Sequence, residues 1–599
     1  MKTNLFHSFT ALFIIAALLI VSTPFMIRTS AETPVHRGAD SADEPQLISG
    51  AEELYALAQR VNSGDPCEGE TFLLTADIVL NDISDFDEWS ASNPPANIWV
   101  PIGDALIVEG FEQGRYFGGH FDGGGHSITG AYIRASAGLN GIGLFGILRG
   151  GSVRNLSLHS FYIPEGANRC GGVVGRAYDA EITNCIASGT ARANSTCGGI
   201  VGEFDGGVIM DCSASVHVNA SLSAGGIVGS CANAEITRCR TIGSVSASNY
   251  TGGIAGLTGD CTLTECASES IVNSIENAAS MVGFCFSTTF IQCIGGGEVH
   301  CGDYAGGIIG GAQYSNIYSC KSCTLIDAER YAGGAAGMCC GTEILHFKNL
   351  GNISGEYYIG GVVGWSYNGA EFGSVSPLES PEDPESYGSG VVIRESCNEG
   401  NITGQWGIGG LIGDCHDTEV YDCYNAGEVY SLQYAGGITG YTADCIIERC
   451  YNAGRVSGGS PIDPIIGSNS ENSTAVDACY YLNTSCASQS QHGTALTDEQ
   501  MRAAENYSGF DFAAVWMMDE SSEYPYAELR GISESAAPIP GDIDANGSIT
   551  VADAVMALRA ALGLTELTPE QRIAADIDGN GAVGAADAVI ILRTAMGLI

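Results

Sequence analysis

The sequence predicts an all-β parallel β-solenoid, three-sided and built from 27-residue coils, followed by a small all-α module at the C-terminus. Three patterns indicate this fold class. The unit Gly-Gly-φ-φ-Gly, where φ is an apolar residue, recurs with a 27-residue period. Aliphatic residues recur at three fixed offsets within the repeat. Near the C-terminus, a twelve-residue acidic segment occurs twice, each time before a helical pattern. Regular repetition at this length is typical of a solenoid or an array.

The repeat positions indicate how each coil is built. Counted from the first glycine as zero, aliphatic residues recur at +2, +11 and +20, for example at Ile308, Ile317 and Ile326. Three inward-pointing residues per repeat describe a coil with three short strands, and such coils stack by parallel pairing about 4.8 Å apart. We expect roughly eleven regular coils, plus two or three irregular ones before Cys170. The units begin at Gly171, Gly198, Gly225, Gly252, Gly306, Gly333, Gly360, Gly409 and Gly436, with degenerate copies at 279–283 and 463–467.

Cysteine follows the same register. It recurs at +14, so the equivalent positions of successive coils form an internal ladder. A buried stack of small apolar residues suits free thiols, and side chains that point the same way from adjacent strands fit disulfide geometry poorly. We expect free core thiols here, with disulfides or metal and redox use as alternatives in an exported chain. The ladder consists of Cys185, Cys212, Cys239, Cys266, Cys293, Cys320, Cys423 and Cys450.

The N-terminus and the overall charge bear on location and partners. Lys2, the apolar run 11–21 and the small residues before Glu32 have the order of a secretory signal, which predicts a signal peptide over residues 1–31 and a secreted chain. We expect no membrane span. With 24 Lys and Arg against 69 Asp and Glu, the net charge of −45 argues against nucleic acid or anionic lipid as a partner.

The two acidic segments near the C-terminus have the spacing of calcium loops. Oxygen-bearing residues occupy positions 1, 3, 5 and 12, with glycine at position 6, which suits a hard cation that takes six to eight oxygen ligands. We therefore expect two Ca²⁺ ions. Gly584 offers no side chain at position 9 of the second loop, so a water is expected there. The predicted ligands are Asp542, Asp544, Asn546, Ser548, Thr550 and Asp553 in the first copy and Asp576, Asp578, Asn580, Ala582 and Asp587 in the second.

On these motifs, residues 541–599 resemble a type I dockerin, the calcium-dependent module that docks secreted proteins onto cohesin domains of a scaffold. Asp at position 12 of both loops fits this family. The resemblance implies a cohesin partner, contacted by loop positions 10 and 11 and by the helix that follows each loop. The two sets nearly match, which implies docking in two orientations. The implied contact residues are Val551, Ala552, Leu558 and Arg559 in the first half and Ala585, Ala586, Leu592 and Arg593 in the second.

The 27-residue units resemble the GLUG motif of large bacterial surface proteins. The flanks share the likeness: 48–63 looks like the opening amphipathic helix, 121–133 like the first coil, and 493–501 with 524–530 like the closing segment. The resemblance implies the architecture of residues 46–531 and says almost nothing about activity. The domains expected are a signal peptide 1–31, an N-terminal cap with irregular coils 32–169, repeats 170–482 with an inserted loop 366–395, a closing segment 483–531, a linker 532–540 and the dockerin 541–599.

No catalytic motif stands out in the body. The sequence has no His-Glu-x-x-His, so the zinc peptidase activity of some GLUG-bearing IgA-cleaving enzymes is not indicated, and it has no Gly-x-Ser-x-Gly elbow. His126 beside Asp122 is either a structural turn or a catalytic pair. The acidic loop 366–395 is either a solvated insertion or a partner contact. A stripe of tyrosines at −2 is either corner packing or a sugar platform: Tyr250, Tyr304, Tyr331, Tyr358 and Tyr434.

Two functions remain open on this basis. The first is a secreted, non-catalytic binding or adhesion module, docked on a cellulosome-like or cell-surface scaffold, with a polysaccharide or host surface as its possible ligand. The second is a carbohydrate-active enzyme of such a complex, either a polysaccharide lyase or a glycoside hydrolase acting in polysaccharide degradation. Only the fold class and the usual association of dockerins with carbohydrate-active enzymes support the second function, and fold does not imply function.

Overall fold

The computed structural model describes residues 44–532 and 541–595, except 104, 109–110, 135–140, 368–389, 471–472, 520–521, 523, 545–548, 563, 566, 568 and 578–582. The predicted signal peptide 1–31, most of the inserted loop 366–395 and most of the linker 532–540 therefore lie outside the described residues. Within the described part of the chain, no helix is both long enough and apolar enough to span a membrane.

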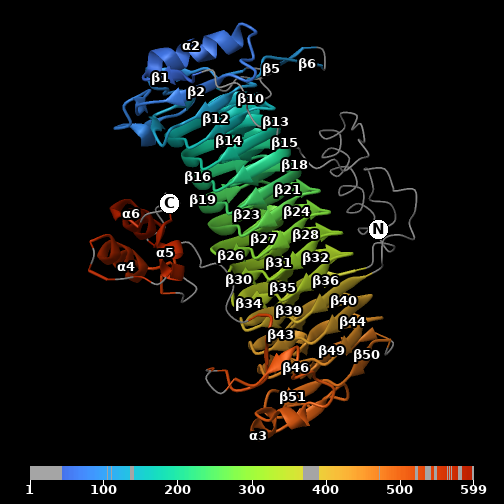
Figure 1. Cartoon of the computed structure of the whole chain (residues 1–599). Coiled ribbons are helices and arrows are strands. Elements are labelled where there is room, and N and C mark those ends of the chain that lie inside the picture. Colours follow the sequence, from blue (N-terminus) through green and yellow to red (C-terminus); the bar gives the residue numbers. More distant parts are fainter. Residues whose placement is uncertain are drawn as a thin grey trace.

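The body is a parallel β-solenoid of about 15 turns, which confirms the predicted fold class. Figure 1 shows an elongated stack that starts beneath helix α2 and continues to the last coil near β51. Every strand of the repeat region pairs in parallel with the strand one coil further on. Ile317 pairs with Ile344, and Ile326 pairs with Ile353, so the register equals the 27-residue period. At the enlarged gap the register continues, because Ile344 pairs with Ile393.

Each coil contributes a strand to three sides. The first side contains β13 (Val174–Thr183), β15 (Val201–Met210), β18 (Val228–Thr237), β21 (Ala255–Gly259), β24 (Val282–Phe286), β28 (Ile309–Gln313), β32 (Ala336–Cys340), β36 (Val363–Ser366), β40 (Ile412–His416), β44 (Thr439–Ala443) and β49 (Ile466–Asn469). In the second-side ladder the separate strands are β22 (Thr262–Thr264), β25 (Thr289–Ile291), β29 (Asn316–Tyr318), β33 (Glu343–Leu345), β37 (Val391–Arg394), β41 (Thr418–Tyr421), β45 (Ile446–Glu448) and β50 (Ala475–Asp477). These two sides belong to one sheet.

The third side belongs to a second sheet. Its longer strands are β12 (Ser157–Gly171), β14 (Ile186–Gly198), β16 (Ser213–Ala220), β19 (Arg240–Ser246), β23 (Ala267–Ala279), β27 (Glu298–Gly306), β31 (Leu325–Gly333), β35 (Ile353–Gly360), β39 (Ile402–Gly409), β43 (Val429–Gly436) and β47 (Val456–Gly458). Short strands precede them in the later coils: β26 (Ile294–Gly295), β30 (Lys321–Ser322), β34 (Lys348–Asn349), β38 (Cys397–Asn398), β42 (Tyr424–Asn425), β46 (Tyr451–Asn452) and β51 (Tyr480–Leu482).

The three aliphatic rows are all buried, and from Val272 onward they fill two separate compartments. Ile308 at +2 and Ile317 at +11 belong to the main hydrophobic core. Ile326 at +20 packs in a second cluster with the row that contains Ala332. Polar side chains at +16 lie between the compartments and press on the second glycine of the motif. A Cβ on Gly334 would lie 2.6 Å from Cγ of Asn349, so this position requires glycine.

In the later coils the side chains at offset +16 form a buried asparagine ladder. Asn349, Asn398, Asn425 and Asn452 are each 0% exposed. The Nδ2 of each of the first three donates to the Oδ1 of the next, at 2.7, 2.7 and 2.8 Å. Each Nδ2 also donates to a glycine carbonyl two residues further on. Buried amides are tolerated when they are hydrogen-bonded, so the ladder ties the coils together inside the core.

Both ends of the stack are covered. At the N-terminal end, helix α2 (Ala51–Asn62) packs beside β1 (Gln46–Ile48) and β2 (Thr71–Leu74), and the short helix η1 (Phe86–Glu88) follows. At the other end, an aromatic cluster around Tyr451 and Trp516 packs under α3 (Asp498–Met501) and η4 (Ala504–Asn506). Such caps are needed because an open solenoid end exposes unpaired strand edges.

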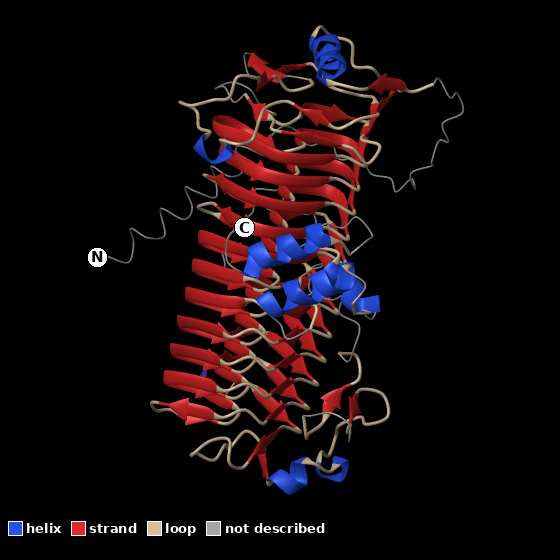
Figure 2. Cartoon of the chain, turned by 90° about the vertical axis from the view of Figure 1, so that its left-hand side faces the viewer, coloured by secondary structure: helices blue, strands red, loops and turns tan. Residues whose placement is uncertain are grey.

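The C-terminal module contains three helices, α4 (Val551–Ala561), α5 (Pro569–Ala575) and α6 (Ala585–Ala595). Figure 1 shows α4, α5 and α6 as a compact group beside the coil stack, and in the turned view of Figure 2 they lie in front of it. Small residues allow α4 and α6 to pack closely: Ala554 and Ala557 face Ala588 and Ile591 in one buried cluster. The same cluster contains Ile242 of β19, so the core of the module packs against the third side of the solenoid.

Candidate metal-binding and docking site

The first acidic loop brings three carboxylates together. Oxygen atoms of Asp542, Asp544 and Asp553 all lie within 4.8 Å of one another. Asp542 is 2% exposed and Asp553 is 0% exposed, whereas Asp544 faces solvent. Calcium–oxygen distances are about 2.3–2.6 Å, so oxygens this close can surround one ion. The predicted ligands Asn546 and Ser548 lie outside the described residues.

Helix α4 holds Asp553 in position. Thr550 is the N-cap, and its hydroxyl accepts a hydrogen bond from the backbone N–H of Ala552. Asp553 stands at the third helical position, where its Oδ2 accepts from the backbone N–H of Thr550 at 2.9 Å and from the Thr550 hydroxyl at 2.8 Å. Its Oδ1 accepts from the N–H groups of Ile543 and Asp544 at 2.9 and 3.1 Å. This capping box fixes the carboxylate at the mouth of the loop.

The second loop repeats this arrangement in its described part. Asp587 is 0% exposed and stands at the third position of α6, and its Oδ2 accepts from the backbone N–H of Gly584 at 2.7 Å. Asp576, the predicted first ligand, is half-buried. Asp578, Asn580 and Ala582 lie outside the described residues. The two halves therefore share the placement of the position-12 aspartate.

The donor set of the first loop fits a hard cation. All three converging groups are carboxylates, and three like charges in so small a volume repel one another unless a cation is present. Asp542, Asp544 and Asp553 would hold the ion, which supplies the charge that stabilises the loop. A soft metal that favours sulfur or imidazole does not match these ligands.

The residues implied as partner contacts lie mainly on the surface. Val551 is 52% exposed and Leu558 is 43% exposed. Ala552, Arg559, Ala585, Ala586 and Arg593 are also exposed, whereas Leu592 is half-buried. The first half therefore presents more apolar surface than the second.

Further apolar residues, which the implied set lacks, extend this surface. Val555, Leu562 and Leu564 are 48%, 64% and 67% exposed, and Val589 on α6 is 54% exposed. Val551, Val555 and Leu558 follow one another at about one-turn spacing on one face of α4, and Leu562, its C-cap, continues the row. We call these four residues the α4 stripe. Val555, Leu558 and Leu562 have the 3–4 spacing of a helical pattern, and in the structure this row faces outward while alanines form the core.

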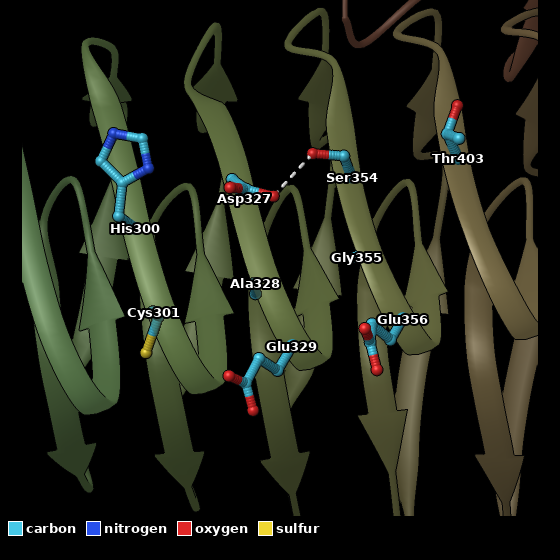
Figure 3. Close-up of a pocket in the computed structure, with 9 residues that line it drawn as sticks. All are labelled: His300, Cys301, Asp327, Ala328, Glu329, Ser354, Gly355, Glu356 and Thr403. Atoms are coloured by element: carbon cyan, nitrogen blue, oxygen red, sulfur yellow. Dashed lines mark hydrogen bonds between the residues drawn. The ribbon is translucent and has the colours of Figure 1, made fainter.

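A shallow polar groove runs across the third side of the solenoid. It has a volume of about 480 Å³ and is lined by residues from successive coils. Figure 3 shows His300, Asp327, Ser354 and Thr403 in one row across neighbouring strands. The row follows from the register, because His300 pairs with Asp327, Asp327 with Ser354, and Ser354 with Thr403. Glu329 and Glu356 line the same groove.

The row does not form a hydrolytic triad. The Ser354 hydroxyl donates to Asp327 Oδ1 at 3.0 Å, and His300 Nε2 lies 3.3 Å from Glu298. In a serine triad the histidine stands between the serine and the acid. Here the carboxylate occupies the middle place, so His300 is not positioned to take the serine proton. The groove offers hydrogen-bonding groups of mixed kind and an acidic rim.

The tyrosine stripe is mainly corner packing. Tyr304 stacks on Tyr331, and Tyr331 on Tyr358, with ring centroids 5.3 Å apart in both pairs. Burial raises the pKa values of all three phenols, and these residues are half-buried. Because each ring face is covered by its neighbour, little face remains for a sugar. This observation favours the packing alternative.

His126 contacts a different carboxylate from the one considered for it. Its Nδ1 lies 3.4 Å from Asp77, and not beside Asp122. The Asp122 carboxylate instead accepts hydrogen bonds from Asn155 Nδ2 at 2.9 Å and Arg154 Nε at 3.0 Å. Asp122 also accepts from the backbone N–H of Gly124, which closes the glycine-rich turn.

Comparisons with known proteins identify two segments. Residues 540–594 match the type I dockerin domain, and residues 166–192 match the GLUG motif. Both resemblances proposed from the sequence are thus confirmed. The chain therefore carries a GLUG motif in its solenoid and a type I dockerin domain at its C-terminus. Type I dockerin domains are generally calcium-binding, and their partners are cohesins.

Two further likenesses are more limited. Over 161 residues the chain is 35% identical to a candidate Gly-rich membrane protein from Evansella cellulosilytica, a match that spans 26% of this chain and only 16% of the length of that relative. The solved structure of a candidate immunoglobulin A1 protease from Bacteroides ovatus aligns over 82% of this chain and 93% of its own, at 15% identity and a TM-score of 0.22. Neither likeness transfers an activity.

Proposed function

We propose that this protein, with its solenoid body and its C-terminal dockerin, is a secreted, non-catalytic binding or adhesion module. In this proposal a calcium-dependent dockerin–cohesin contact holds it on a cellulosome-like or cell-surface scaffold. The observation that carries the proposal is the α4 stripe directly beside the converging carboxylates of the first loop. Asp553 belongs both to the metal cluster and to the first turn of α4.

Calcium would act by organising the loop that begins α4. Without the ion, the charges of Asp542, Asp544 and Asp553 repel one another because their oxygens lie within 4.8 Å. Neutralising them fixes the loop against the N-terminus of α4 and so presents the stripe as a preformed surface. A preformed apolar patch with Arg559 at its edge has the composition of a protein-binding surface.

The polar groove supports a binding role for the body. It is shallow, it is lined by hydroxyl, carboxylate and imidazole groups, and it follows the register of the coils. Repeated polar groups at one-coil spacing suit an extended ligand with many hydroxyl groups, such as a polysaccharide. The arrangement of His300, Asp327 and Ser354 supplies no activated nucleophile, so the groove favours binding over acyl transfer.

The docking part is tested by calorimetric titration of the full chain with a panel of type I cohesins, in calcium and in chelator. We expect binding in calcium only. Asp542→Ala with Asp576→Ala should abolish binding and leave the unfolding of the solenoid unchanged. A matched control, Asp85→Ala with Asp87→Ala, removes two exposed acidic side chains at η1 in the N-terminal cap and should bind normally. Binding that persists in the first variant would contradict calcium-dependent docking.

The binding part is tested separately on the same chain with a panel of plant and host polysaccharides. Retention on immobilised polymer reports binding, and release of reducing ends or of unsaturated products reports depolymerisation. Asp327→Ala should weaken retention, and Asp179→Ala, at an exposed position of β13, serves as the control. Turnover of any polymer would instead establish the carbohydrate-active enzyme.

A further inference from the structure

A line of buried side-chain pairs joins consecutive coils at the corner between the first and second sides. In each pair, a residue near the end of a first-side strand contacts a residue at the start of the second side of the next coil. The sequence offset within a pair is 30, except for 32 at the last pair and 52 across the enlarged gap. The pairs are Cys231–Cys261 at 3.7 Å, Thr258–Thr288 at 3.1 Å, Cys285–Ser315 at 3.3 Å, Ser366–Thr418 at 2.9 Å, Cys415–Cys445 at 2.9 Å and Thr442–Thr474 at 2.8 Å.

The pairs are matched in chemistry although they lie in different coils. Hydroxyl meets hydroxyl three times, thiol meets thiol twice, and one thiol meets a hydroxyl. Within the chain, therefore, the residue at one position of the pair changes together with the residue at the other. In five of the six pairs the corner takes two hydroxyls that share a hydrogen bond or two thiols, and Cys285–Ser315 is the mixed pair. All four cysteines of the two thiol pairs are at most 3% exposed.

The offset distinguishes these two pairs from the cysteine ladder. Neighbouring ladder cysteines are one 27-residue repeat apart, so their side chains leave equivalent positions in the same direction. The Sγ of Cys239 accordingly faces the carbonyl oxygens of Thr237 and Ile209, at 3.5 and 3.7 Å. An offset of 30 lets the two side chains approach each other from different places on the coil. The 2.9 Å between the sulfurs of Cys415 and Cys445 is within about 1 Å of a disulfide bond length.

We propose that Cys415–Cys445 and Cys231–Cys261 form disulfide bonds that join consecutive coils, while the ladder cysteines remain thiols. Cys170 and Cys197 provide an internal comparison. Their sulfurs are also 2.9 Å apart, but the residues are in-register partners on β12 and β14, with the same offset of 27 as the ladder. We therefore expect Cys170 and Cys197 to remain free thiols. The relative direction of the side chains, and not proximity alone, decides which pairs bond.

The bond forms by thiol–disulfide exchange with a low-molecular-weight disulfide. One cysteine thiolate attacks the small disulfide and displaces one thiol, and the second cysteine then displaces the other from the mixed disulfide. Two S–H bonds of the protein and one S–S bond of the oxidant are lost, while one protein S–S bond and two small thiols form. Two electrons and two protons pass to the oxidant. Because the sites are buried in the folded coils, the exchange must occur before the corner closes, in an oxidising compartment.

Peptide mapping of the full chain tests this proposal. The protein is refolded with oxidised glutathione, denatured in a thiol-alkylating reagent without reductant, digested and analysed by mass spectrometry. We expect two cross-linked peptides, Cys415 with Cys445 and Cys231 with Cys261, and alkylation of all the other cysteines. Alkylation of any of these four before reduction would overturn the proposal. A cross-link within the ladder, or between Cys170 and Cys197, would overturn it as well.

The chain supplies its own control variant. Cys415→Thr with Cys445→Thr copies the Thr442–Thr474 pair of the next coil, so the corner stays filled. This variant should fold, lose only its own cross-link and keep the one between Cys231 and Cys261. Reductant should lower the midpoint of thermal unfolding by more in the wild type than in the variant. Equal sensitivity to reductant would show that no bond forms between Cys415 and Cys445.

Discussion

Replacing Asn425 by alanine should destabilise the solenoid strongly, because the amide links two neighbouring asparagines. Its Oδ1 accepts from Asn398 at 2.7 Å, and its Nδ2 donates to Asn452 at 2.8 Å and to the carbonyl of Gly427 at 3.0 Å. The substitution leaves three buried polar groups without these partners. Leaving a buried group unsatisfied costs about 1–3 kcal/mol. With some relaxation, we expect a loss of about 3–5 kcal/mol in the free energy of unfolding.

The end of the ladder provides the matched control. Asn452→Ala removes the acceptor of Asn425 and the donor to the Gly454 carbonyl, so two groups lose a partner. Its cost should be about 2–3 kcal/mol. Urea unfolding followed by circular dichroism measures both losses, and hydrogen exchange shows whether the openings are local to these coils. If Asn425→Ala cost no more than Asn452→Ala, the ladder would not act as a connected network.

Three further predictions concern the metal, the thiols and the docking surface. Chelation should unfold residues 541–599 and leave the solenoid intact, because ion binding supplies folding free energy there; an unchanged circular dichroism spectrum of that module on chelation would contradict this. Cys239→Ser should lower the free energy of unfolding by about 1–3 kcal/mol, because it buries a hydroxyl in the core with only the carbonyl oxygens of Thr237 and Ile209 beside it; denaturant titration measures the loss, and a neutral result would refute it. Changing Leu592 and Arg593 together should weaken cohesin binding roughly twofold in calorimetry, because the first half of the module still docks. Changing Leu558 and Arg559 as well should abolish binding. If the second-half variant alone lost most of the affinity, the module would dock in a single orientation.

The periodic part of the fold was predictable from the sequence, whereas the role of the polar residues between the buried rows was not. Spacings of nine among aliphatic residues predict three buried rows, and Ile308, Ile317 and Ile326 are all buried. The division of the core depends on Asn349 and its equivalents. These residues recur in register, but a polar residue in a repeat is typical of a turn. Only the structure shows which residues across the coil it packs against. The contact with the second glycine is made across the coil, and spacing along the chain does not reveal it.

The candidate docking site was likewise predictable only in part. The loop spacing predicted the converging carboxylates, because Asp542, Asp544 and Asp553 occupy positions 1, 3 and 12 of a calcium loop. The outward direction of Val555 and Leu562 was not predictable from the helical pattern, since a 3–4 row reads equally well as core. The alanines of α4 and α6 decide the question, because only small residues let the helices approach this closely. The pairing of corner side chains depends on which coils become neighbours, and the 27-residue period alone does not show an offset of 30.

The strict register of the coils restricts how such a protein can change its length. Each strand pairs with the residue one period on, so removing residues 306–332 would join equivalent positions and keep every inward row continuous. Removing one residue fewer would shift each later side chain to the opposite face of its strand. The rod can therefore gain or lose length only in whole coils of about 4.8 Å. Gene duplication of one repeat is a tolerated event in such a chain, whereas an insertion within a coil must keep the register on both sides of it, as the pairing of Ile344 with Ile393 across the enlarged gap shows.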